Sequence, residues 1–179
     1  MSKIEFKDSG MCFSFLESDC YRIEDSQTHK AVGDGIKICE CLVKRKNSVL
    51  FIEAKTSFSN PRNHKDFASN IQEIVDKLHN SICIYLGLLC DRPFAKKDDL
   101  PLNLRPSAVK SSPFKCYLII RNHQEDWLGS VDEALNIAMK HYKKIFAIED
   151  IKVLNEKLAL KYNLIQAISS NWKELSPLR

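Results

Sequence analysis

Two neighbouring stretches of the chain are rich in apolar and β-branched residues, and a polar segment separates them. They run from Ile36 to Val43 and from Val49 to Thr56, with Lys44 to Ser48 between them. Runs of this kind on either side of a short polar segment are typical of two strands joined by a turn. The pattern therefore predicts a β-hairpin, and we place its two-residue turn at Lys46-Asn47.

The predicted register brings two acidic side chains together. With this turn Arg45 faces Ser48, and further along the same ladder Glu40 faces Glu53. Residues directly opposite each other share a sheet face, with Cβ atoms about 4.5–5.5 Å apart. Lys55 lies two residues after Glu53 and shares its face. The sequence thus predicts two carboxylates and an ammonium group at one place on the sheet.

The second strand of this hairpin is predicted to be buried. Alternating Glu and Lys residues are usually found on a solvated strand face, which is the ordinary interpretation of a single Glu-x-Lys. Here, however, both faces of the strand carry apolar residues, namely Val49, Leu50, Phe51, Ile52 and Ala54. Such a strand is typical of a sheet interior, where charges are rarely kept for solubility. We therefore expect Glu53 and Lys55 to be functional.

Paired carboxylates in an apolar sheet indicate a cation. Like charges directly opposite each other destabilise a sheet, and a cation between them relieves the repulsion. Carboxylate oxygens are ligands of Mg²⁺ and Mn²⁺. A bound metal lowers the pKa of water, and an ammonium group stabilises charge that develops on a phosphate. Glu40 and Glu53 are thus predicted to hold Mg²⁺ or Mn²⁺, and Lys55 to take part in phosphodiester hydrolysis.

The apolar pattern after the hairpin predicts a helix and a further strand. From Asn63 to Leu86 apolar residues recur at three- and four-residue intervals, which predicts a helix packed on the sheet. On this helix Glu73 and Lys77 are spaced for an ordinary surface ion pair. Phe114 to Arg121 is predicted to be a buried strand, placed beside the hairpin by a right-handed crossover. His123 follows that strand, where a lone histidine is more often structural than catalytic.

The C-terminal third is predicted to be scaffold. We expect a helix from Trp127 to Tyr142 with Ser130 as its N-cap, a short edge strand at Phe146 to Ile148, and a helix from Ile151 to Leu164. These segments are expected to cover the second face of the sheet. Residues 91–113 contain four prolines and few apolar residues, which indicates a long irregular excursion, either a substrate-binding flap or a dimer arm.

Composition limits the class of protein. With 179 residues, of which 44% are hydrophobic, the chain is expected to form one α/β domain over residues 1–179. Seven cysteines without a Cys-x-x-Cys spacing argue against a zinc site or a disulfide framework. The first residues contain no apolar signal core and no run approaches the length of a membrane span, so we expect a soluble cytoplasmic protein. The net charge of +4 is too small to identify a nucleic-acid partner alone.

The strand pair resembles the motif of the PD-(D/E)XK phosphodiesterase superfamily, the restriction-endonuclease-like nucleases. Glu53-Ala54-Lys55 matches the second half of that motif residue for residue. Glu40 stands where the family usually has aspartate, and Cys39 where it usually has proline. The resemblance implies an α-β-β-β-α-β core with a mixed central sheet flanked by helices. It also implies a Mg²⁺-dependent nuclease, and small bacterial members suggest defence against foreign DNA.

The resemblance also points to further site residues. An additional acid often precedes the first acidic strand in this family, and Glu24 is the candidate here, while the backbone carbonyl of Ala54 would be another metal ligand. Asp34 is an alternative to Glu40 as the first acidic ligand. The expected nucleic acid is DNA, and four basic residues are candidates for contact with it: Lys44, Lys46, Arg62 and Lys65.

Other functions stay open on the sequence alone. The same domain without catalysis would be an inactive nuclease-like module that binds nucleic acid or a protein partner. A homodimer is compatible with either function. Substrate class, mode of cutting and specificity are not encoded in the motif.

Overall fold

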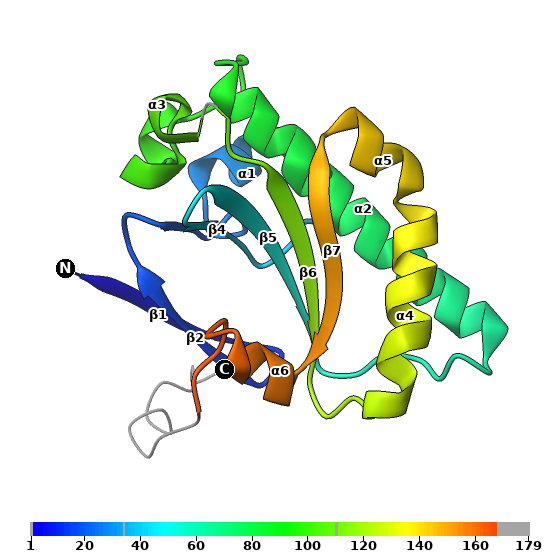
Figure 1. Ribbon diagram of the computed structural model, residues 1–179. Coiled ribbons are helices and arrows are strands. Elements are labelled where there is room, and N and C mark those ends of the chain that lie inside the picture. Colours follow the sequence, from blue (N-terminus) through cyan, green and yellow to red (C-terminus); the bar gives the residue numbers. More distant parts are fainter. Residues whose placement is uncertain (1, 34, 110, 168–179) are drawn as a thin grey trace.

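The central sheet has five strands and mixed direction. The computed structural model describes residues 2–33, 35–109 and 111–167. The strands, in spatial order, are β3 (Cys20–Tyr21), β4 (Cys41–Arg45), β5 (Ser48–Lys55), β6 (Phe114–Ile120) and β7 (Ile148–Asn155) (Figure 1). β3, β4 and β5 pair antiparallel, whereas β5, β6 and β7 pair parallel. The expected α/β class, with a mixed sheet flanked by helices, is confirmed.

Helix α1 (Gln27–Val32) stands between the first two strands of this sheet in chain order. Ser26 caps it, because its side chain accepts a hydrogen bond from the His29 N–H. The strands β3 and β4 are therefore adjacent in space although α1 separates them in sequence.

The predicted hairpin register is confirmed. β4 and β5 pair from Arg45 opposite Ser48 to Cys41 opposite Ile52. Lys46 takes a positive φ of 48° in the turn. Every residue of β5 before Lys55 is buried, in line with apolar residues on both faces. The local pattern of this hairpin was sufficient to define its pairing.

The predicted first strand is too long by several residues. Residues 36–40 are not in a strand, and β4 begins at Cys41. Their backbone groups find other partners, because the Lys37 carbonyl accepts a hydrogen bond from the Asn80 amide and the Cys39 N–H donates to Ser81 Oγ at 2.8 Å. The Glu40 N–H donates to the Ile52 carbonyl, so Glu40 and Glu53 lie just beyond the last ladder pair.

One face of the sheet is covered by three helices, α2 (His64–Leu89), α4 (Glu125–Ala138) and α5 (Lys140–Ile145) (Figure 1). The predicted helix after the hairpin is confirmed as α2, whose buried residues pack on apolar residues of β5 and β6. The prediction of Ser130 as an N-cap is wrong, because α4 begins earlier and Gln124 is its N-cap. Glu125 and Asp126 in its first turn are favourable near the positive end of the helix dipole.

The C-terminal third departs most from expectation. The predicted helix from Ile151 to Leu164 is wrong over its first part, because β7 continues to Asn155 and only α6 (Glu156–Lys161) is helical. Ile151 and Val153 pack on the helical side of the sheet while Leu154 packs on the other, which is the two-residue period of a strand. The Asn155 side chain then accepts a hydrogen bond from the Leu158 N–H and caps α6.

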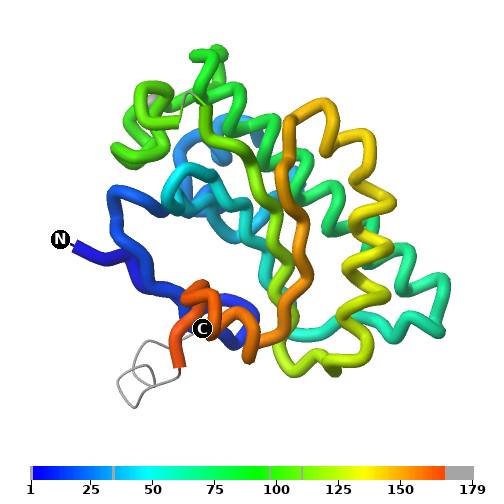
Figure 2. Tube along the Cα trace, viewed as in Figure 1, coloured from blue at the N-terminus to red at the C-terminus, as the bar shows by residue number. Residues whose placement is uncertain are grey.

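The opposite face is covered by a hairpin from the N-terminus. β1 (Lys3–Asp8) and β2 (Met11–Leu16) form a separate two-stranded sheet. Its aromatic residues and residues of α6 share a core with the second face of the central sheet. Figure 2 shows this hairpin next to the segment that follows α6, where Cys12 pairs with Gln166. The expectation that α4 and α5 cover this face is wrong, since they lie in the layer of α2.

The proline-rich segment at 91–113 is mostly irregular, as predicted. Its described residues contain two 3-10 turns, at Lys97–Asp99 and Leu102–Leu104, and the short helix α3 (Pro106–Val109). Asp99 anchors it, because its carboxylate accepts hydrogen bonds from the N–H and hydroxyl of Thr28. Among the described residues, no helix has both the length and the apolar character needed to cross a membrane.

Candidate functional site

Glu53 is a fully buried acid near the C-terminal end of β5. Its side chain is 0% exposed, and its Oε1 lies 2.7 Å from the Nζ of Lys77 on α2. The same Nζ lies 3.7 Å from Oε1 of Glu40, whose side chain is only 8% exposed. The two glutamates that the sequence predicted to meet do so around a lysine ammonium group that it did not place there.

Lys55 lies on the same face of β5, as predicted. Its Nζ is 2.6 Å from Oε1 of Glu73, one turn before Lys77 on α2. The predicted surface ion pair between Glu73 and Lys77 is therefore wrong. Instead both helix side chains point toward the sheet. Glu73 of α2 pairs with Lys55 of β5, and Lys77 of α2 pairs with Glu53 of β5.

Ser81, one turn after Lys77 on α2, links the helix to the segment that precedes β4. Ser81 Oγ donates a hydrogen bond to the Lys77 carbonyl at 2.8 Å and accepts one from the Cys39 N–H at 2.8 Å. Cys39 directly precedes Glu40 in the chain. This contact fixes the helix turn that carries Lys77 against the segment that carries Glu40.

The turn between β1 and β2 brings a further acid to this end of the sheet. Ser9 and Gly10 both have positive φ, 46° and 74°, as a tight two-residue hairpin turn requires. The Ser9 hydroxyl lies 3.0 Å from the Ala54 carbonyl oxygen and 3.0 Å from Asp8 Oδ1. Carboxylate oxygens of Asp8, Glu24 and Glu40 lie within 4.8 Å of one another.

Asp8 is a residue that the sequence analysis missed. Its signal was present, because Ser9-Gly10 is flanked on both sides by alternating apolar residues, which is typical of a hairpin. What sequence could not supply is the docking of that turn on β5. Lys77 was missed for a similar reason, since the rotation of α2 about its axis is fixed by tertiary packing.

Burial makes both central acids hard to ionise. Burial is the main cause that raises the pKa of Glu53 to about 7, and the nearby Lys77 ammonium opposes it. The pKa of Glu40 is raised well above its usual range by burial first, and then by its hydrogen bond with Asp8 and the charge of Glu53. Neighbouring acids raise the pKa of Lys77 against the effect of burial, so that lysine stays charged.

The side chains present fit a divalent metal such as Mg²⁺ or Mn²⁺. The carboxylates of Asp8, Glu24 and Glu40 come together from three separate segments, and Glu53 shares Lys77 with Glu40. Hard oxygen donors are what these ions prefer. Glu53 Oε2 is buried and has no hydrogen-bond partner among the described residues, which is costly unless a ligand completes it. Glu40 and Glu53 with Asp8 and Glu24 would hold the ion.

The remaining predicted metal ligands have mixed outcomes. Glu24 lies with Asp8 and Glu40 in one group of carboxylates, the acidic group. Its side chain is 56% exposed, and its Oε2 lies 4.0 Å from a guanidinium nitrogen of Arg22. The Ala54 carbonyl already accepts the Ser9 hydroxyl, which links the N-terminal turn to the motif. Asp34 lies outside the described residues. His123 packs against the rings of Phe58 and Trp127 and is not in the acidic group.

The predicted nucleic-acid contacts fall at two different places. Arg62 and Lys65 are exposed and lie between β5 and the first turn of α2, where Lys65 is roughly 18 Å along the helix from Lys77. Lys44 and Lys46 lie toward the other end of the hairpin, roughly 13 Å and 20 Å from Glu40 at the usual strand rise. The structure therefore does not bring the four basic residues into one group.

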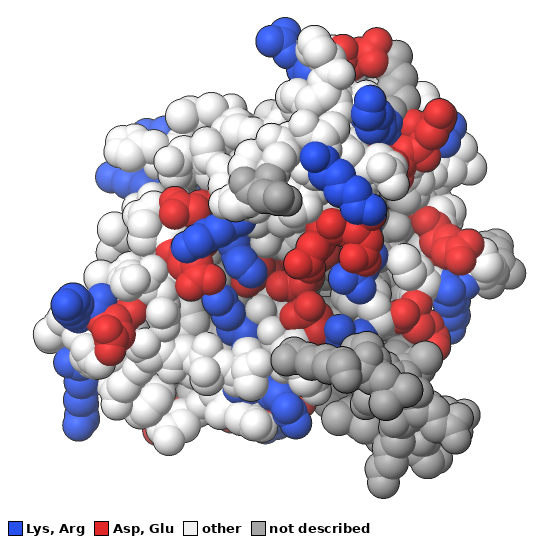
Figure 3. Space-filling model, turned by 180° about the vertical axis from the view of Figure 1, so that it is seen from behind, with Lys and Arg blue, Asp and Glu red and all other residues white. Residues whose placement is uncertain are grey.

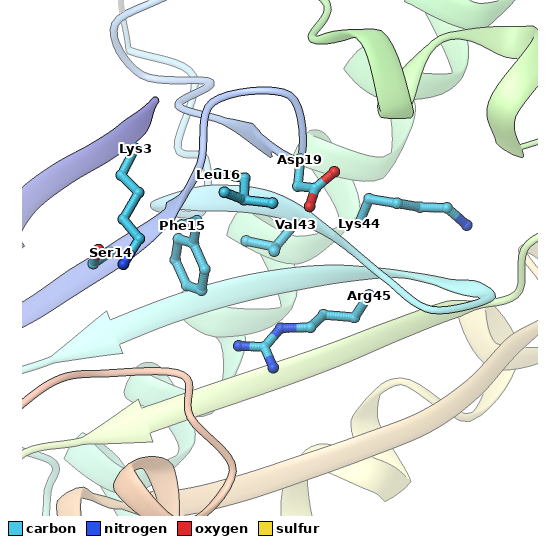
Figure 4. Close-up of a pocket in the computed structure, with 8 residues that line it drawn as sticks. All are labelled: Lys3, Ser14, Phe15, Leu16, Asp19, Val43, Lys44 and Arg45. Carbon is cyan, nitrogen blue, oxygen red and sulfur yellow. The ribbon is translucent and has the colours of Figure 1, made fainter. Parts of the chain in front are cut away.

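The hairpin tip borders a shallow pocket of about 240 Å³ on the side of β2. In Figure 4 the Lys44 and Arg45 side chains extend in opposite directions. Lys44 Nζ donates to Ser112 Oγ at 2.6 Å, whereas Arg45 bonds to the Asn163 carbonyl and lies over the Phe15 ring. The basic tip residues thus have structural partners of their own.

Surface charge adds no simple signal of a polyanion partner. Figure 3 shows acidic and basic side chains interleaved across one face of the molecule, without a broad area of one sign. Binding to a nucleic-acid backbone would then depend on local groups near the acids.

Comparison of the chain with protein-family models, curated proteins and solved structures found no match.

Proposed function

We propose that this protein is a divalent-metal-dependent nuclease that hydrolyses phosphodiester bonds in nucleic acid. One observation carries the proposal: buried Glu40 and Glu53 converge at the end of β5, beside Lys55 and the carboxylates of Asp8 and Glu24. Buried acids with strongly raised pKa values are frequent at functional sites and are costly elsewhere.

The acids have a defined task in this proposal. Glu40 and Glu53 bind Mg²⁺ or Mn²⁺, with Asp8 and Glu24 completing the oxygen ligands. A metal at this position supplies a Lewis acid that lowers the pKa of a water molecule and offsets phosphate charge. Glu40 gives up its proton when the metal binds, so metal affinity should rise with pH.

Lys55 is the proposed catalytic ammonium group. Its side chain is 25% exposed, so it can reach a bound phosphate while remaining in contact with Glu73. The 2.6 Å ion pair makes Glu73 a positioning residue, because it limits the rotamers of a long and otherwise mobile side chain. Lys55 then orients the attacking water and stabilises the charge that develops on the phosphate.

DNA is the substrate class that we favour, with exposed Arg62 and Lys65 in the connection from β5 to α2 as contacts to its backbone. The seven free thiols suit a reducing compartment such as the cytoplasm.

A second candidate function is supported by Lys77. Its ammonium group already pairs with Glu53 and Glu40, so the acids have a counterion without any metal. An inactive nuclease-like module that binds nucleic acid or a protein partner would retain this arrangement. Such a module would bind no Mn²⁺ at the glutamates.

The test is a cleavage assay with purified protein on labelled duplex DNA, single-stranded DNA and RNA, with Mg²⁺, Mn²⁺ or a chelator. We expect cleavage that needs the metal, and a loss of at least about 100-fold in Glu53→Gln and Lys55→Ala. Lys140→Ala is the matched control, because Lys140 begins α5 at the opposite end of β7 from the acids.

Two results would argue against this mechanism. Cleavage at the unchanged rate by Lys55→Ala would remove the proposed catalytic group. Absence of cleavage on all substrates, together with absence of Mn²⁺ binding in calorimetry, would favour the non-catalytic module.

A further inference from the structure

Lys77 lies where a divalent cation would have to bind the two glutamates. Its Nζ is 2.7 Å from Glu53 Oε1 and 3.7 Å from Glu40 Oε1. The side chain is only 18% exposed, so water does little to weaken these ion pairs. Lys77 thereby offsets the repulsion between two acids that are both close and buried.

A metal and Lys77 cannot both keep their preferred contacts with Glu53. Mg²⁺ binds carboxylate oxygen at about 2.0–2.1 Å, so two cations on Oε1 would lie within a few ångströms of each other. Glu53 Oε2, which is buried and has no partner among the described residues, offers the ion a first contact. Charge repulsion would then weaken the bond between Lys77 and Oε1.

The displaced ammonium group has another acid near it. Glu73 lies one turn earlier on α2, and the charge of Lys77 acts on it. The lysine stem is flexible, whereas its backbone is fixed through Ser81 to Cys39. Movement of the side chain alone can therefore release Glu53 without a shift of the helix.

We infer that Lys77 is a built-in counterion that a divalent metal must displace from Glu53, so that Lys77 limits the metal affinity of this site. The inference rests on the proposed function, since it assumes that the glutamates bind a metal. It adds a residue outside the Glu-x-Lys motif and gives that residue a definite task. In the absence of metal Lys77 keeps the acids together, and metal binding releases its ammonium group.

The first test is calorimetric titration of Mn²⁺ into the wild type, Lys77→Gln, Lys77→Arg and Lys140→Gln. Loss of a competing charge at this distance should tighten binding by at least about tenfold in Lys77→Gln. Lys77→Arg keeps the charge and should show no gain. Lys140→Gln changes the net charge equally at a distant exposed site and should stay within about twofold of the wild type.

The second test uses the wild type alone and so does not depend on the folding of a variant. Lysines are acylated briefly with and without Mg²⁺, and the modified peptides are measured by mass spectrometry. Lys77 should react slowly without metal and several-fold faster with it, while Lys140 reacts equally in both. Equal protection of Lys77 with and without bound Mg²⁺ would overturn the inference.

The outcomes separate this inference from the proposed function. If the wild type binds Mn²⁺ and folded Lys77→Gln binds no more tightly, the counterion idea fails and the nuclease proposal stands. If Lys77→Gln binds and the wild type does not, the inference holds and the wild type is not a metal enzyme. If neither folded protein binds, both ideas fail.

Discussion

The two ends of the β4–β5 hairpin carry similar numbers of charged residues but keep them in different states. At the tip, Lys44, Arg45 and Lys46 are half-buried or exposed, and they contact uncharged groups such as the Ser112 hydroxyl. At the other end, Glu40 and Glu53 are buried and share Lys77. The charged side chains at the tip thus have separate partners, whereas the two acids at the other end share one lysine.

This difference shows which charges merit a functional interpretation. An exposed lysine keeps its hydration, so its presence costs little and implies little. A buried acid loses hydration and persists only with compensating partners. Glu53 has a side chain at 0% exposure, and its Oε2 has no hydrogen-bond partner in the described part of the chain. It is therefore the strongest indication of function in the hairpin.

The largest expected effect is loss of the shared lysine. Lys77→Met leaves Glu53 buried without its cation, and we expect the free energy of unfolding to fall by about 2–4 kcal/mol at pH 8 without metal. Lys46→Met, at the exposed tip, should change it by less than about 0.5 kcal/mol. Urea denaturation in the presence of a chelator measures both. Equal stability of Lys77→Met and the wild type would show that the buried ion pair contributes nothing.

The two ends also differ in how far sequence could predict them. The Lys46-Asn47 turn fixes the register through neighbouring residues, and that register is confirmed. The partners of Glu53 and Lys55 come instead from α2, whose rotation depends on packing along its length. Local pattern therefore located the acids but assigned Glu73 and Lys77 to the wrong partners.

The same limit explains the errors elsewhere in the fold. Residues 36–40 have a strand-like composition, but Asn80 and Ser81 of α2 take the hydrogen bonds that a neighbouring strand would have used. Apolar residues from Ile151 onward fit a helical period as well as a strand period, and parallel pairing with β6 decides for the strand. In both cases a distant segment determines the local structure.

The next effect is a dependence of stability on pH. Glu53 has an ordinary pKa of 4.5 in the unfolded chain and about 7 in the fold, and Glu40 is raised further. Because the folded state binds these protons more tightly, this contribution is present at low pH and is lost as pH rises through the folded pKa values. From pH 6 to pH 7, which lies between the unfolded and folded pKa values of both acids, the metal-free protein should lose up to about 1.4 kcal/mol of stability for each acid.

The variants Glu40→Gln and Glu53→Gln provide the control for this pH effect. Each should flatten the curve of melting temperature against pH, while Lys46→Met leaves its slope unchanged because that lysine lies at the exposed tip. Addition of Mg²⁺ should raise the melting temperature more at pH 8.5 than at pH 6, because the ion needs the charged carboxylates. A flat curve for the metal-free wild type would contradict the raised pKa values.

The smallest expected effect distinguishes two tight turns. The Ser9-Gly10 turn contacts β5 at Ala54, next to Glu53, whereas the Lys46-Asn47 turn lies at the opposite end of β5. Gly10 has a φ of 74°, and an added Cβ would meet the guanidinium group of Arg121. Gly10→Ala should therefore lower the free energy of unfolding by about 1–2 kcal/mol. It should also weaken Mn²⁺ binding, because the same turn carries Asp8 and contacts Ala54 through Ser9.

The control is Lys46→Ala in the distant turn. It keeps a non-glycine residue at a φ of 48°, so it should change neither stability nor metal affinity measurably. Urea denaturation and calorimetry measure the two quantities, and unaltered metal affinity in a destabilised Gly10→Ala would exclude the N-terminal turn from the metal site.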